Sequence, residues 1–124
     1  MFKTVLITLI TLASTITYAQ KWEKIGEDAE VINYVDRTSV RKNGSKFKIW
    51  GLTNFKVQES DGVFSQRYQD EFDCVNENRR TTYISSHYGK FADGGIKFNS
   101  PIEGEWRPIP PGTVANKILK TFCF

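Results

Sequence analysis

The sequence predicts an α+β domain that is mainly β: an antiparallel sheet of about six strands, connected as a meander, with one C-terminal α-helix packed on one face. Three observations predict this fold. Segments that alternate polar and apolar residues recur between turn signals. A single run with helical periodicity follows at the C-terminus. The chain's two cysteines, Cys74 and Cys123, fall on a predicted strand and at the end of that helix, so a disulfide would tie the helix to the sheet.

The first 19 residues have the features of a secretory signal peptide. Lys3 supplies a positive charge, residues 5–16 are apolar with interspersed threonines, and Ala19 is a small residue at the expected cleavage site. We therefore expect an exported protein with no transmembrane segment after cleavage; an uncleaved N-terminal anchor is the alternative. No cysteine follows the cleavage site, so we expect no lipoprotein anchor.

The predicted mature chain is long enough for one domain. Removal of the first 19 of 124 residues leaves 105, at residues 20–124, which corresponds to a single small core. Without Lys3 the chain has 16 basic and 14 acidic side chains, a net charge of +2. This weak charge argues against a nucleic-acid-binding protein, which would have a clearly basic domain.

Two strands and a corner are predicted before the first strong turn. Residues 21–25 alternate charged and apolar side chains, and Gly26 is expected to end that strand. Residues 29–36 are rich in β-branched and aromatic residues and predict the second strand. The segment Asp36 to Val40 is interpreted as a corner, because an aspartate side chain can accept hydrogen bonds from nearby backbone amides.

A long central strand follows the turn at Asn43-Gly44. It is predicted at residues 46–57, where both faces carry apolar residues, so we expect this strand to be covered on both sides. Gly51 lies in its middle, and glycine inside a strand indicates a bulge or the close approach of another group.

Three more strands complete the predicted meander. Residues 65–74 place Tyr68, Phe72 and Cys74 on one face, which we expect the helix to cover. Residues 79–88 alternate regularly, so the odd-numbered and even-numbered side chains should lie on opposite faces. A short strand is predicted at residues 96–98, and residues 99–112 are expected to form a loop.

The last segment predicts the helix. An apolar stripe recurs at helical spacing and consists of Val114, Ala115, Ile118, Leu119 and Phe122. Pro110 and Pro111 prevent extension towards the N-terminus, and Gly112 or Thr113 is expected to be the N-cap. A helix of this length is not stable alone in water, so its stripe must pack on the sheet.

Few groups suggest chemistry. His87 lies on a predicted strand face with Ser85, and Asp70 or Asp73 could lie on a neighbouring strand, but nothing marks an activated nucleophile or an oxyanion hole. We therefore interpret His87 as a surface residue and predict no catalytic residue. The cysteines are interpreted as a disulfide, because the chain has no C-x-x-C motif and no second histidine for a redox or metal site.

The acidic run Asp70, Glu71 and Asp73 lacks the spacing of a calcium loop, so we predict no metal site. These carboxylates are expected to pair with basic side chains on adjacent strands, with the candidates Lys46, Lys48, Lys56, Arg79 and Arg80.

Landmarks along nearly the whole mature chain resemble the bacterial surface-adhesin protein E-like domain family. They are Trp22, the segment from Tyr34 to Val40, Trp50-Gly51-Leu52, Asp73-Cys74 with Arg79 or Arg80, Tyr88, the segment from Trp106 to Thr113, and Cys123. The resemblance implies the same sheet, helix and disulfide. The best-known member of the family looks like an outer-membrane adhesin that dimerises and binds host extracellular-matrix and plasma proteins, with haem binding also attributed to it, and the resemblance implies a protein of this kind.

No ligand-binding position can be transferred from the family, so the chain carries no predicted cofactor-binding residue. The resemblance leads us to expect a non-enzymatic, exported module with protein partners, including host matrix proteins, and the capacity to form a homodimer. The absence of a lipid-anchor cysteine favours an alternative, a periplasmic envelope accessory protein with no host ligand. An exposed aromatic and basic surface on a sheet edge or loop would distinguish the adhesin.

Overall fold

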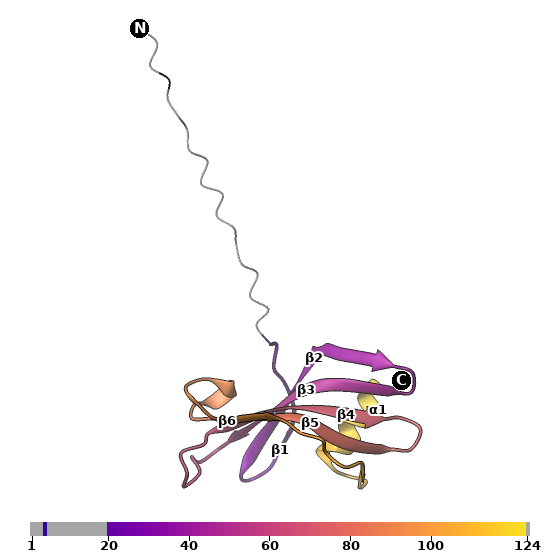
Figure 1. Cartoon of the computed structure of the whole chain (residues 1–124). Coiled ribbons are helices and arrows are strands. Elements are labelled where there is room, and N and C mark those ends of the chain that lie inside the picture. Colours follow the sequence, from indigo (N-terminus) through magenta and orange to yellow (C-terminus); the bar gives the residue numbers. More distant parts are fainter. Residues whose placement is uncertain (1–3, 5–19, 124) are drawn as a thin grey trace.

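In the computed structural model the chain forms one antiparallel sheet with a helix on one face (Figure 1). The structure describes residue 4 and residues 20–123, so the predicted signal peptide lies outside the described residues. The elements are β1 (Glu23–Glu27), β2 (Val31–Asn43), β3 (Lys46–Phe55), β4 (Ser65–Asp73), β5 (Asn78–His87), the 3-10 helix η1 (Lys90–Ala92), β6 (Ile96–Pro101), β7 (Arg107–Pro108) and α1 (Val114–Phe122).

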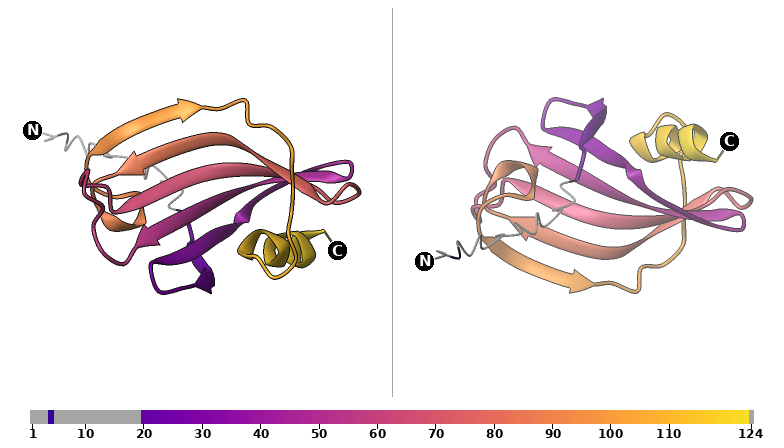
Figure 2. Two further views of the ribbon diagram at one scale, coloured as in Figure 1. Left: turned by 90° about the horizontal axis from the view of Figure 1, so that it is seen from below. Right: turned by 90° about the horizontal axis from the view of Figure 1, so that it is seen from above.

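The strands form the predicted meander, in the order β1-β2-β3-β4-β5-β6, each antiparallel to the next. The prediction that residues 99–112 form a loop is wrong at two places. β6 continues to Pro101, and the two-residue strand β7 pairs with the start of β5, with Pro108 opposite Asn78. The segment between β6 and α1 then crosses over the strands to bring the helix to the β1 side of the sheet (Figure 2).

The predicted corner at Asp36 to Val40 is a bulge inside β2. The pairing with β3 moves from Asp36 opposite Trp50 to Arg41 opposite Lys48, which leaves residues 37–40 out of register. The aspartate does form the expected local turn, because the Thr38 amide donates to Asp36 Oδ1 at 3.0 Å. The strands nevertheless stay together, since the Trp50 amide donates to Ser39 Oγ at 2.9 Å.

The predicted end of the first strand at Gly26 is also wrong. Gly26 lies within β1, next to a bulge that shifts the pairing with β2. A side chain at this position would bring its Cβ to 2.6 Å from Val114 Cγ2. Glycine is therefore required here by the contact between strand and helix rather than by a turn.

Helix α1 packs its predicted stripe on the sheet. Thr113 is the N-cap, and its Oγ1 accepts a hydrogen bond from the Asn116 amide at 3.2 Å. The core combines the helix with one face of the sheet, called the helix face below, and its buried members are Ile25, Val35, Phe47, Ile49, Phe72, Ala115, Ile118, Leu119 and Phe122. The prediction that the face of Phe72 and Cys74 is covered by the helix is confirmed.

The disulfide joins Cys74, directly after β4, to Cys123, the C-cap of α1. Their Cα atoms are 5.7 Å apart, and 49 positions separate them in the sequence. The bond therefore fastens the last turn of the helix to the hairpin between β4 and β5, as predicted.

A bulge in β5 changes the predicted faces of this strand. Gln69 lies opposite Tyr83, but Asp70 lies opposite Thr81, so Thr82 is an extra residue. Because each register shift of one residue exchanges the two faces, Arg79 and Thr81 share the helix face with Ile84. The regular alternation predicted for residues 79–88 is therefore wrong across Thr82.

Candidate binding surfaces

His87 and Ser85 are buried rather than at the surface, so that expectation is wrong. They are 5% and 1% exposed, and Ser85 Oγ lies 2.7 Å from His87 Nε2. The reason is the segment 88–95, which folds back over this face: Ser65 Oγ, opposite His87 in the sheet, donates to the Gly89 carbonyl at 2.7 Å and accepts from the Ala92 amide at 2.9 Å.

The pair lacks the third member of a catalytic triad. His87 Nδ1 is buried and has no hydrogen-bond partner among the described residues, so no acid orients the ring. Asp70 lies on the helix face, opposite to the face of Ser85 in the register. Burial, and then the neighbouring positive charge of Arg67, lower the pKa of His87, and both effects favour the neutral ring. This arrangement is a buried hydrogen bond without the parts that activate a nucleophile.

The acidic run pairs partly as predicted. Arg79 Nη1 lies 3.3 Å from Asp70 Oδ2, and Arg80 Nη2 lies 2.7 Å from Glu71 Oε1. Asp73 has a different role, because its Oδ1 accepts hydrogen bonds from the amides of Val75 and Asn76, each at 3.0 Å.

These environments move the two aspartate pKa values in opposite directions. Burial raises the pKa of Asp70, and the hydrogen bonds from Thr81 and Arg79 offset only part of that effect. The amide and side chain of Asn76 lower the pKa of Asp73, because they stabilise the carboxylate. The described residues contain no cluster of ligands that could hold a metal ion.

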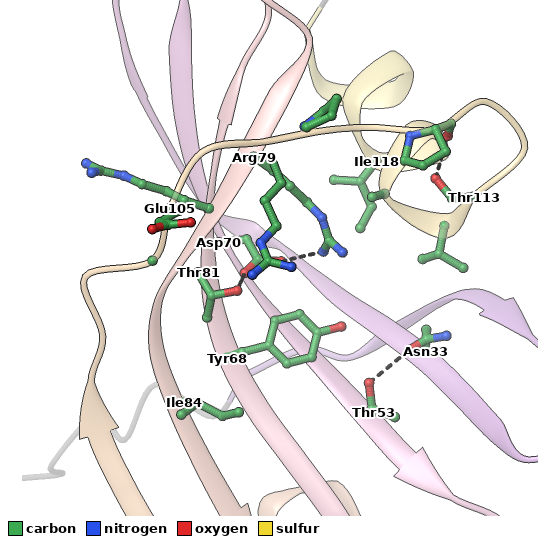
Figure 3. Close-up of a pocket in the computed structure, with 17 residues that line it drawn as sticks. Asn33, Thr53, Tyr68, Asp70, Arg79, Thr81, Ile84, Glu105, Thr113 and Ile118 are labelled. Carbon is green, nitrogen blue, oxygen red and sulfur yellow. Dashed lines mark hydrogen bonds and ion pairs between the residues drawn. The ribbon is translucent and has the colours of Figure 1, made fainter.

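A groove lies on the helix face, between the sheet, α1 and the segment before it (Figure 3). Its volume is about 730 Å³. The floor is polar, with Tyr68, Asp70 and Thr81 from β4 and β5, and Asn33 and Thr53 from β2 and β3 (Figure 3). The walls include the apolar Pro108, Pro110, Val114 and Ile118 and the charged Glu105 and Arg107.

A second surface lies at the end of the sheet away from the helix. We call it the tip surface and define it by five apolar side chains that are 45% to 80% exposed: Val57, Tyr88, Phe91, Ile96 and Phe98. They come from the β3–β4 loop, the β5–β6 connection and the start of β6, which lie together at this end (Figure 2). β6 is an edge strand, with β5 on one side and no described strand on the other.

The sequence matches the family described as surface-adhesin protein E over residues 22–124. The chain belongs to this family. The match spans all the described strands and the helix, so the resemblance inferred from the sequence landmarks is confirmed.

Solved structures of Haemophilus influenzae protein E have the same fold as this member of the family. One crystal form is 12% identical, with 80% of this chain and 91% of that chain covered and a TM-score of 0.56. Protein E from a non-typeable strain is also 12% identical, with 90% and 81% covered and a TM-score of 0.57. A further structure is 11% identical, with 82% and 92% covered and a TM-score of 0.55. No curated protein sequence matches the chain.

The surface-adhesin protein E domain described here has no helix, within its described residues, that combines the length and the apolar character needed to cross a membrane. Its two candidate surfaces were not predicted from sequence. Tyr68 and Arg79 were assigned to strands but not to a groove, and the only sequence signal for it was Gly51, a glycine in the middle of a strand. The exposed side chains of the tip surface could not be separated from core residues by pattern alone.

Proposed function

We propose that this protein is an exported, non-enzymatic binding module of adhesin type, which contacts partner proteins outside the inner membrane through its tip surface. The family supports an adhesin, and the signal-like N-terminus supports export. The observation that carries the proposal is the tip surface, where exposed aromatic and aliphatic side chains occur in the loops at one end of the sheet, and two of them, Ile96 and Phe98, lie on the edge strand β6.

Two properties of the tip surface suit protein recognition. Edge strands offer unpaired backbone groups to which an extended segment of a partner can add as a further strand. Aromatic side chains contribute much of the binding free energy in protein interfaces. Phe98 combines both features, because it lies on the edge strand and 54% of it is exposed.

Positive charge accompanies these apolar groups. Lys90 Nζ lies 5.6 Å from the centre of the Phe64 ring, and Lys97 pairs with Asp61 at 2.7 Å. Exposed aromatic side chains with lysines nearby support an adhesin over a periplasmic accessory protein.

The absence of an activating constellation around His87 supports a binding role rather than catalysis. Among the described residues, its ring bonds to a buried serine and pairs with no carboxylate. We therefore expect the exposed surface to bind a partner protein rather than to catalyse a reaction.

The test has two arms. In the first, intact cells that produce the full chain are treated with protease and the protein is followed by blotting; degradation or release into the medium is expected. In the second, the exported protein is tested for binding to a panel of purified extracellular-matrix and plasma proteins, with sedimentation measured in parallel to detect a homodimer.

Phe98→Asp should weaken binding to the partner by about tenfold or more, because a charge replaces an exposed interface anchor. The matched control is Val75→Asp, which alters another exposed apolar side chain, 73% accessible, at the helix end of the molecule. Protection of the protein inside intact cells would instead favour the periplasmic accessory protein. Equal binding by both variants would exclude the tip surface as the contact.

A further inference from the structure

The floor of the groove contains a flat aromatic platform. Gly51 lies opposite Tyr68 in the pairing of β3 with β4. A Cβ atom at Gly51 would lie 2.5 Å from Tyr68 Cε2 and 2.8 Å from Cζ. The tyrosine ring therefore occupies the space that any other residue at position 51 would fill, and it lies against the backbone of β3. Its outer face lines the groove and is seen nearly face-on in Figure 3.

Polar side chains flank this platform on two sides. On one side, Asp70 accepts a hydrogen bond from Thr81 Oγ1 at 2.7 Å and pairs with Arg79. On the other side, Thr53 Oγ1 donates to Asn33 Oδ1 at 2.9 Å. All of these groups project from the four central strands β2 to β5, so their spacing is set by the register of the sheet rather than by a loop.

The charges around the groove nearly balance. Asp70 and Glu105 oppose Arg79 and Arg107, while the remaining arginine, Arg80, is paired with Glu71. An anionic ligand would compete with the two acidic side chains for the arginines, and a cationic ligand would compete with the arginines for the acidic side chains. The lining therefore favours a neutral ligand that has both hydrogen-bonding groups and an apolar surface.

We propose that this groove binds a pyranose sugar unit of a neutral glycan. A pyranose ring has an apolar face of C–H groups, which can lie on the face of Tyr68, and hydroxyl groups around its rim. Carboxylate, guanidinium and amide side chains can each make two hydrogen bonds to neighbouring hydroxyls, and these types flank the platform as Asp70, Arg79 and Asn33. The volume of about 730 Å³ admits a short oligosaccharide.

This site is separate from the proposed protein contact. The groove is lined by α1 and the segment before it, whereas the loops that carry the tip surface lie at the end of the sheet away from α1 (Figure 2). Sugar binding and protein binding are therefore measured in different assays, and failure of one proposal leaves the other open to its own test.

The experiment is a titration of the isotope-labelled exported protein with neutral oligosaccharides built from galactose, glucose and N-acetylglucosamine, followed by amide chemical shifts and by saturation transfer to the sugar. Binding should shift the amides of β3, β4 and β5 around Tyr68. Saturation should be strongest at the C–H face of the ring. Sialylated and sulfated glycans of the same length should bind more weakly.

Three variants locate the site. Tyr68→Leu should weaken binding by about tenfold, since it removes the aromatic platform. Tyr68→Phe keeps the ring and should retain most of the affinity. Gly51→Ala does not touch the sugar but forces the ring away from the sheet, so it should also weaken binding. Val75→Asp, at an exposed position that does not line the groove, is the control and should bind as the wild type does.

Two sources of the sugar are distinguished by comparing a free oligosaccharide with a glycoprotein that carries the same glycan, before and after enzymatic removal of that glycan. Loss of groove shifts on removal indicates recognition of protein-linked glycans. No shift in β3 to β5 with any neutral sugar, or unchanged affinity in a folded Tyr68→Leu protein, would overturn the proposal.

Discussion

Removal of the Cys74–Cys123 disulfide should cost this domain a large share of its stability. The bond closes a chain segment of 49 positions. The chain-entropy estimate for a loop of this length is about 4 kcal/mol. A small domain has a total unfolding free energy of roughly 5–15 kcal/mol, so the double variant Cys74→Ala with Cys123→Ala should remain folded at 25 °C but with little reserve. Its Tm should fall by roughly 15–30 °C.

The loss should be concentrated at the C-terminal helix. α1 has nine residues, which is too short to persist in water without tertiary packing. Without the disulfide, the helix depends on non-covalent packing on the sheet, above all by the buried side chains of Ile118, Leu119 and Phe122. Hydrogen exchange of the helix amides should therefore accelerate more than that of β3 and β4 in the same variant.

The assay is urea unfolding followed by circular dichroism and tryptophan fluorescence, under oxidising and reducing conditions. Reduced wild-type protein should resemble the double variant, and the double variant should not respond to reductant. Under oxidising conditions, a difference of less than about 1 kcal/mol in unfolding free energy between wild type and the double variant would refute the reasoning. It would mean that the packed helix keeps its position without the covalent bond.

Three further predictions concern single side chains. Phe72→Ala should lower the unfolding free energy by about 3–5 kcal/mol in urea titrations, because Phe72 is fully buried and its ring stacks on Phe47 at 5.0 Å between centroids. The control Val75→Ala alters an exposed neighbour and should change the unfolding free energy little. Thr113→Ala should cost about 1 kcal/mol and reduce helix protection in hydrogen exchange, since it removes the N-cap of α1. Asp73→Ala should be destabilising at neutral pH, and the difference in unfolding free energy from wild type should shrink from about pH 5 towards pH 3. The folded-state pKa of Asp73 lies below its ordinary value, so its contribution to stability is lost as the carboxylate is protonated. An unchanged difference at about pH 3 would contradict this.

The parts of the fold that depend on local chemistry could be predicted from the sequence. Alternation of side chains identified the strands of the meander, and Asn43-Gly44 identified the tight turn between β2 and β3. The apolar stripe identified α1, because a helix that packs on a sheet must bury one side. Two cysteines in a chain predicted to be exported allow one disulfide, and the predicted strand and helix bring both partners to the same face of the sheet.

The parts that depend on distant contacts could not be predicted in this way. Asp36 does make its local turn with Thr38, yet the strand continues, because the hydroxyl of Ser39 receives a hydrogen bond from Trp50 on the next strand. Gly26 resembled a strand end, but its lack of a side chain serves the contact with Val114, almost ninety positions later. In both cases the local sequence signal reflects a real property of the residue, but a contact with a distant part of the chain keeps the strand going instead of ending it.

The groove shows the same limit most clearly, since its composition depends on a single extra residue in β5. A regular pairing beyond Tyr83 would place Thr82 and Arg80 on the helix face, opposite Asp70 and Phe72. The bulge at Thr82 instead places Thr81 and Arg79 there, where both contact Asp70. The residue types around Tyr68 were therefore visible in the sequence, but which arginine pairs with Asp70 on the groove floor is decided by the register, and a register is a property of paired strands rather than of either strand alone.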